Sequence, residues 1–301
     1  MPWEEKPERN AKTQAWECEL VKPGLGQFEK DRVYHGDALR LMPLIPPCSI
    51  DLVVTDPPFA IDFQAQKQNY NRTGENVLEG YAEIAPDDYG SFTSSWLNEA
   101  YRVLSDSGSI YVFSGWNRLK DVLSGLDAAG FHTVNHIIWK YQFGVFTRKK
   151  YVTSHYHILF AVKNPRCYTF HKVDHYPEDV WVINREYWKG KKKTPTKLPG
   201  ELVRKILRYS SNPGDIVLDP FLGSGTVAVE SMATGRHFLG FELVEAYYQF
   251  ASERIALSDE AMKKTGIPEI TKPGPETTKP GKMEESQGRR KKISLDAEGE
   301  I

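Results

Sequence analysis

Cysteine, long apolar runs and net charge are all scarce in this chain of 301 residues. Its three cysteines, Cys18, Cys48 and Cys167, form no CxxC pair, which argues against a disulfide framework and a zinc site and favours a reducing cytoplasm. No apolar run approaches the length that a bilayer requires, so we expect no membrane association. Because the formal net charge is only −1, any binding of nucleic acid must come from local basic segments.

A proline-rich corner follows an apolar, β-branched run at 50–54, which predicts a buried strand. Pro57 and Pro58 cannot extend that strand, since neither has an N–H for the ladder. The turn therefore places Asp56 and Phe59 at the carboxyl edge of a sheet, where open α/β sheets bind ligands. A carboxylate beside a backbone carbonyl can accept the hydrogens of an aromatic amine, and Phe59 can stack on its ring. The alternative is a helix-capping Asp before a rigid turn.

The remaining pattern alternates strands with helices, which predicts an α/β fold with a mostly parallel sheet and helices on both faces. The strand at 155–162 is expected to run antiparallel to its predecessor, because the loop between them holds no crossover helix. Further strands are predicted at 31–35, 109–113, 131–139, 215–219 and 237–242, and helices at 38–44, 87–104, 117–129, 198–211 and 227–234.

A glycine-rich turn follows the strand at 215–219 and opens a helix. Gly223 and Gly225 let the backbone pass close beneath a ligand, and Glu242 ends the next strand, where an acid can bind a ribose diol. The turn is not the GxGxxG pattern of dinucleotide-binding proteins, and no GK[ST] phosphate loop occurs. These features together predict a nucleoside-binding half-site. Asp37, at an earlier strand-to-helix turn, either caps its helix or accepts a hydrogen bond from the ligand.

Composition predicts the domain boundaries. Residues 1–30 are expected to form an irregular arm, 31–257 a catalytic domain and 258–301 a disordered tail, because the tail repeats TKPG and has few large apolar residues. The polar segment 60–86 is predicted to be a lid over the proline-rich corner.

Two basic segments with interleaved aromatics are candidates for nucleic-acid binding, although a solvated loop is the usual alternative. Their candidate residues are Arg148, Lys149, Lys150, Trp188, Lys189, Lys191, Lys192 and Lys193.

The two motifs, in this order, resemble the permuted β group of amino-methylating DNA methyltransferases over roughly residues 31–255. The resemblance implies a Rossmann-like, S-adenosylmethionine (SAM)-dependent fold with a small inserted target-recognition region at 163–193. It assigns catalysis to Asp56, Pro57, Pro58 and Phe59. It assigns SAM binding to Asp37, Ala38, Asp219, Phe221, Gly223, Ser224, Gly225, Thr226 and Glu242. Thr196 is added from a segment similar to HPTxKP, which departs from that pattern at Thr194 and Leu198.

An acidic first residue, Asp56, resembles the adenine-N6 enzymes, so the resemblance implies transfer of a methyl group from SAM to adenine in double-stranded DNA after base flipping. The alternatives are a cytosine-N4 enzyme, an RNA or protein-glutamine methyltransferase, and a regulator that binds SAM or DNA without catalysis. A cognate restriction endonuclease is a possible partner, and the protein is expected to be a monomer or homodimer. No metal is expected.

Overall fold

The computed structural model describes residues 23–58, 84–142, 144, 147–186 and 197–265. Within these ranges eight strands form one sheet in the order β1-β8-β7-β2-β3-β5-β4-β6. The strands are β1 (Arg32–His35), β2 (Ile50–Thr55), β3 (Leu104–Ser114), β4 (His132–Lys140), β5 (His155–Val162), β6 (Val180–Val182), β7 (Ile216–Asp219) and β8 (His237–Glu242).

Only β5 runs antiparallel to its neighbours β3 and β4, whereas every other pair in the sheet is parallel. The predicted mostly parallel sheet and the reversed direction of residues 155–162 are therefore confirmed. Strand β6 was not predicted, because three residues of the form Val-Trp-Val are too short for periodicity to separate from a loop.

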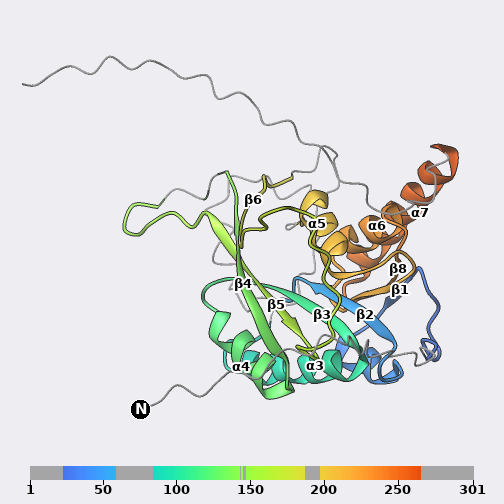
Figure 1. Cartoon of the computed structure of the whole chain (residues 1–301), viewed down its shortest axis with the longest axis horizontal. Helices are drawn as coiled ribbons and strands as arrows, with labels where there is room; N and C mark the ends of the chain where they lie inside the picture. The colour runs from blue at the N-terminus through green and yellow to red at the C-terminus, as the bar shows by residue number, and fades with distance from the viewer. Residues whose placement is uncertain (1–22, 59–83, 143, 145–146, 187–196, 266–301) are drawn as a thin grey trace, which may run out of the picture. The chain divides into compact units, whose positions relative to one another are not determined.

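Helices cover both faces of the sheet, as predicted (Figure 1). One face is covered by α1 (Ala38–Leu41), the short 3-10 helix η1 (Met42–Leu44), α3 (Tyr89–Val103) and α4 (Leu119–Ala129). The other is covered by α5 (Gly200–Ser210), α6 (Thr226–Ala233) and α7 (Glu245–Thr265). In α3, the residues Tyr89, Trp96, Leu97 and Ala100 are fully buried, which is the apolar stripe that its sequence predicts.

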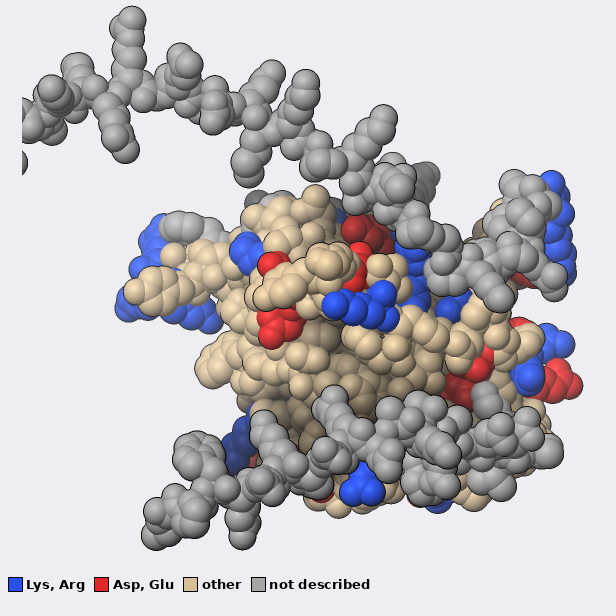
Figure 2. Space-filling view, viewed as in Figure 1, with Lys and Arg blue, Asp and Glu red and all other residues tan. Residues whose placement is uncertain are grey.

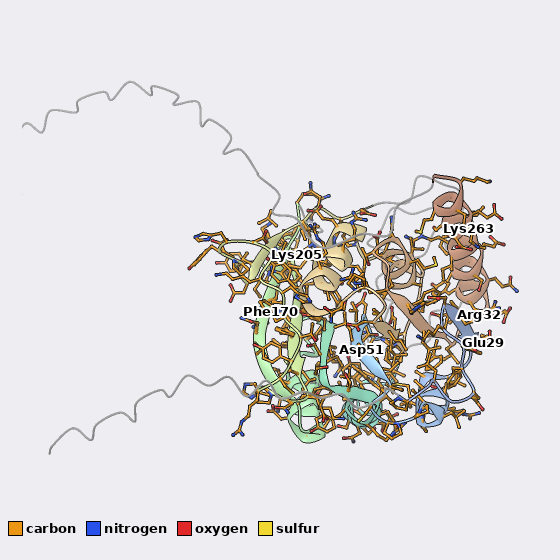
Figure 3. The ribbon with its side chains drawn as sticks, turned by 45° about the vertical axis from the view of Figure 1, so that its right-hand side comes forward. Glu29, Arg32, Asp51, Phe170, Lys205 and Lys263 are labelled. Carbon is orange, nitrogen blue, oxygen red and sulfur yellow. The ribbon has the colours of Figure 1, made fainter. Side chains whose placement is uncertain are left out.

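Both ends of the predicted catalytic domain extend further than composition indicates. At the start, Leu25 and Phe28 are buried, and the ring of Phe28 packs on Tyr34 at 4.9 Å between centroids. At the other end, α7 continues past the predicted boundary at 257 to Thr265. The last turns of α7 are polar and exposed, so they carry no apolar signal. Ion pairs four residues apart, such as Asp259–Lys263 at 2.6 Å, support this end of the helix. Figure 3 labels Lys263 on this helix.

The rest of the predicted arm and tail lies outside the described residues, as does most of the predicted lid. None of the helices in the described ranges combines the length and the apolar character that crossing a membrane requires.

A buried carboxylate ties the two halves of the chain together at the start of the central strands. Asp51 in β2 is only 7% exposed, and its Oδ2 atom accepts a hydrogen bond of 2.9 Å from the backbone N–H of Ile216 in β7. Figure 3 shows Asp51 among the strands, whereas Glu29 lies at the margin of the molecule.

We expect Asp51→Ala to lower the free energy of unfolding by about 1–3 kcal/mol, because it leaves the buried N–H of Ile216 without an acceptor. Urea denaturation measures the change. The control is Glu29→Ala, which removes an exposed ion pair with Arg32 and should change stability by less than about 1 kcal/mol. Equal effects from the two substitutions would contradict this account of Asp51.

Candidate functional site

The carboxyl ends of β2 and β7 lie side by side, because these strands pair in parallel in the middle of the sheet. Thr55, the last residue of β2, donates a hydrogen bond of 2.9 Å to Oδ1 of Asp219, the last residue of β7. The proline-rich corner and the glycine-rich turn, far apart in sequence, are thus joined at one edge of the sheet.

A pocket opens at this edge and is lined by residues from both motifs. Gly225 lies in the same turn but is not among the lining residues. Phe59 and Thr196 lie outside the described residues. The predicted site residues that line the pocket are Asp37, Ala38, Asp56, Pro57, Pro58, Asp219, Phe221, Gly223, Ser224, Thr226 and Glu242.

Asp56 has an unused hydrogen-bond acceptor in this pocket. Its Oδ1 atom is buried and accepts no hydrogen bond from any of the residues that the structure describes. Burial raises the pKa of Asp56 to about 7, although the positive charge of Arg185 opposes the rise. A buried acceptor without a donor is costly, so this atom is prepared for a donor that a ligand brings.

The glycine-rich turn is held open by Glu242 from the end of β8. Its Oε2 atom accepts a hydrogen bond of 2.8 Å from the N–H of Gly223, and its Oε1 atom accepts one of 2.8 Å from Val244. Gly223 and Gly225 have φ angles of 54° and 76°, in the left-handed region that favours glycine. Each carboxylate oxygen can accept more than one hydrogen bond, so Glu242 can hold the turn and still bind ribose hydroxyls.

Asp219 is a second buried acid at the pocket. Its Oδ1 atom accepts hydrogen bonds from Thr55 and from the N–H of Phe221, at 3.1 Å. Burial raises the pKa of Asp219 to about 7 despite these bonds, and the negative charges of Asp56 and Glu242 add to the rise. Burial likewise raises the pKa of Glu242, against the hydrogen bonds from the backbone. Three acids around one pocket favour a ligand that carries positive charge.

Asp37 takes the capping role that its sequence position predicted, and its place at the pocket leaves the ligand role available. Its Oδ1 atom accepts a hydrogen bond of 3.0 Å from the N–H of Leu39, so it caps α1. It also lines the pocket, so a second contact to a ligand is sterically open.

Several pocket residues were missed by the sequence reasoning. Ile84, Phe92, Leu198, Leu243 and Tyr247 supply much of the apolar lining, but nothing in the sequence marks them apart from core or surface residues. Leu198 stands where the family segment carries Lys, and its neighbour Lys197 forms an ion pair of 2.6 Å with Glu186.

Arg254 in α7 was also missed. Its Nη1 atom donates hydrogen bonds of 2.8 Å to the carbonyl of Ser224 and 3.0 Å to Oγ1 of Thr226. Arg254 therefore fixes the far side of the glycine-rich turn. No sequence signal marks Arg254, because its role depends on α7, whose Ala251 lies close to Gly225.

The first basic segment lies away from the pocket. Arg148, Lys149 and Lys150 are exposed in the loop between β4 and β5, next to Tyr151, which is 98% exposed. Figure 2 shows Lys and Arg side chains gathered over this loop. The candidate residues of the second segment, from Trp188 to Lys193, lie outside the described residues.

SAM fits this pocket by its chemistry. Its cationic groups suit a pocket lined by acids such as Asp219, its ribose hydroxyls suit Glu242, and its adenine suits the apolar wall. Among the described residues no group of three or more His, Cys, Asp and Glu side chains could hold a metal ion.

The chain is similar to proteins that methylate DNA. A sequence model of the DNA methylase family matches residues 50–253. The type II methyltransferase M.HpaI of Haemophilus parainfluenzae is 30% identical over 243 residues, which cover 74% of this chain and 74% of the relative.

Two solved structures share the fold. The M1.HpyAVI–SAM complex matches with a TM-score of 0.56 and 24% identity, over 74% of this chain and 98% of that chain. The cytosine-N4-specific PvuII DNA methyltransferase matches with a TM-score of 0.59 and 17% identity, over 81% and 96%.

We expect Gly225→Ala to weaken SAM binding by about tenfold or more, measured by calorimetry. A Cβ atom at Gly225 would lie 3.2 Å from Cβ of Ala251 and would add left-handed strain of about 1–2 kcal/mol.

Gly214→Ala is the matched control, because Gly214 has a φ of 86° but open space around its Cβ position. Gly214→Ala should lower the free energy of unfolding by an amount similar to that of Gly225→Ala and should keep the wild-type affinity for SAM. Equal SAM affinity in the two variants would mean that the turn at Gly225 does not carry the cofactor.

Proposed function

This chain belongs to the N6/N4 DNA methylase family of SAM-dependent DNA methyltransferases, and from this premise we propose that it methylates the exocyclic N6 amine of adenine in duplex DNA. The observation that carries the proposal is Oδ1 of Asp56, which is buried and has no hydrogen-bond partner among the described residues, in a residue that lines the same pocket as the glycine-rich turn. An acceptor without a donor, beside a site suited to SAM, is what an incoming amine requires.

In the proposed mechanism the chain positions SAM and the target base and accepts hydrogen bonds from the exocyclic amine of the base. Oδ1 of Asp56 accepts one hydrogen, and the carbonyl of Pro57 accepts the other. These two hydrogen bonds shift electron density onto the amine nitrogen, whose lone pair is otherwise conjugated into the ring of the base. SAM, when bound, supplies a methyl group that is already activated for transfer. Catalysis by this chain would therefore rest on orientation and electrostatics.

The proton released in the reaction has an acceptor close by. As the N–C bond forms and the C–S bond breaks, the amine nitrogen becomes cationic and must lose one proton. Burial raises the pKa of Asp56 to about 7, so its carboxylate holds a proton more readily than an ordinary aspartate does. Asp56 would thus serve first as hydrogen-bond acceptor and then as proton acceptor.

Adenine is preferred to cytosine because the first residue of the corner is Asp56, as in the adenine-N6 enzymes that the motif resembles. Methylation of N4 of cytosine would use the same contacts and is the second candidate. The permuted order of the motifs counts against an RNA or protein-glutamine substrate. The intact pocket counts against a regulator without catalysis.

The partners follow from this proposal. Because the target amine lies inside the duplex, the base must rotate out of the stack into the pocket. The loop with Arg148, Lys149 and Lys150 is well placed by its exposure to contact phosphates. The target-recognition region at 163–193, a cognate restriction endonuclease, a monomeric or homodimeric state and a cytoplasmic location stay predictions.

Methyl transfer from labelled SAM to unmethylated genomic DNA, followed by mass analysis of the nucleosides, tests the proposal. N6-methyldeoxyadenosine is the expected product. N4-methyldeoxycytidine would keep the mechanism and change the base. A protein that binds SAM but leaves no label in DNA would contradict the proposal.

We expect kcat/KM to fall at low pH, because Asp56 must be ionised to accept the amine hydrogens. With a pKa of about 7, only about one-tenth of Asp56 is ionised at pH 6, so activity should drop about tenfold below its plateau there. The negative charge of Asp56 adds to the raised pKa of Asp219, so the two carboxylates repel each other. Asp219→Asn removes this repulsion and should therefore move the low-pH limb of the activity profile to lower pH. A limb that stays in place in Asp219→Asn would show that another group controls it.

A further inference from the structure

Arg185, just after β6, lies over an aromatic surface. Its guanidinium carbon lies 3.8 Å from the ring centroid of Tyr141 and 5.6 Å from that of Tyr156. These rings continue into Trp139, whose ring stacks on Tyr156 at 5.9 Å between centroids. A guanidinium that lies on an aromatic face keeps the N–H groups along its edge available for other partners.

The backbone around Arg185 is fastened to the end of β4. The N–H of Arg185 donates a hydrogen bond of 2.8 Å to Oε1 of Gln142, and Nε1 of Trp139 donates one of 2.8 Å to the carbonyl of Ile183. The N–H of Ile183 also donates to the carbonyl of Lys140, at 3.1 Å. These hydrogen bonds hold the backbone of Arg185 in a fixed position beside the end of β4.

Arg185 lies on the same side of the sheet as the catalytic corner. Val54, two residues before Asp56, packs in the same core cluster as Trp139, Tyr141 and Ile183. The charge of Arg185 lowers the pKa of Asp56, so the two groups interact across the carboxyl edge. No Asp or Glu in the part of the chain that the structure describes forms an ion pair with Arg185. Asp56, the carboxylate whose pKa Arg185 lowers, is reserved in our proposal for the amine.

We propose that Arg185 binds the DNA backbone phosphate next to the nucleotide that rotates into the pocket, an inference that rests on the proposed function. Extrusion of a base turns the sugar about its flanking phosphates, so an enzyme gains by holding one of them in place. A half-buried, prestacked guanidinium suits that task, because its fork matches two phosphate oxygens and little side-chain freedom is lost on binding. Arg185 would act as a positioning residue and would not read the base.

The test compares Arg185→Met with Arg166→Met. Arg166 is exposed in the turn after β5, at the opposite edge of the sheet, so its variant loses the same charge away from the pocket. The probe is a short duplex that the wild-type protein methylates, with its Kd measured by fluorescence anisotropy over a range of NaCl concentrations.

Arg185→Met should raise the Kd for DNA by about tenfold or more and reduce the slope of log K against log[salt] by about 0.9, the contribution of one phosphate contact. The Kd for SAM should stay unchanged. Arg185→Lys keeps the charge but loses the fork, so its salt slope should match wild type while its Kd rises by a smaller factor. Arg166→Met should resemble wild type in all three quantities.

The inference is overturned if Arg185→Met binds DNA with wild-type Kd and salt slope and changes only the pH profile of methyl transfer, since Arg185 would then serve Asp56 alone. It is also overturned if the variant loses discrimination against one altered base pair, because Arg185 would then read a base. Failure of the proposed function is separate, since it appears as the wrong methylated nucleoside, or none, from the wild-type protein.

Discussion

The parallel pairing of β2 with β7 is the constraint on which the site depends. It brings together two motifs that lie far apart along the chain, and the hydrogen bond from Thr55 to Asp219 fixes their relative position. At the other end of the same two strands, the hydrogen bond from the N–H of Ile216 to Asp51 joins β7 to β2. Any shift of one strand against the other would separate Asp56 from the glycine-rich turn, to which we assign the amine and the cofactor.

The same pairing creates an electrostatic conflict. Asp56, Asp219 and Glu242 face one pocket, and burial raises the pKa of each. Without a ligand, the folded chain therefore holds three acids whose charged forms would be better solvated in water. In our proposal a cationic cofactor relieves that conflict, and an amine supplies the donor that Oδ1 of Asp56 lacks among the described residues. The cost to stability is the kind expected at a catalytic site, where groups are arranged for a ligand.

Local sequence signals were sufficient for much of the fold and for the pocket's polar residues. Some sequence features impose a backbone conformation, so they predict both the kind of element and where it begins or ends. Examples are the buried run at 50–54, the prolines after Asp56 and the glycines at 223 and 225. Arg254 and Arg185 could not be found in this way, because their roles depend on contacts across the fold. Helix α7 was not among the predicted helices, and its end is supported by ion pairs that give no apolar signal.

The most direct test of the account is the single-turnover rate of methyl transfer to DNA by Asp56→Ala at saturating SAM, with SAM affinity measured on the same sample. The account predicts loss of transfer with SAM affinity close to that of the wild type. In our proposal the cofactor binds to Glu242 and to the glycine-rich turn that Glu242 holds in place, independently of Asp56. Transfer at the wild-type rate, or loss of SAM binding together with transfer, would contradict the assignment of Asp56 to the amine.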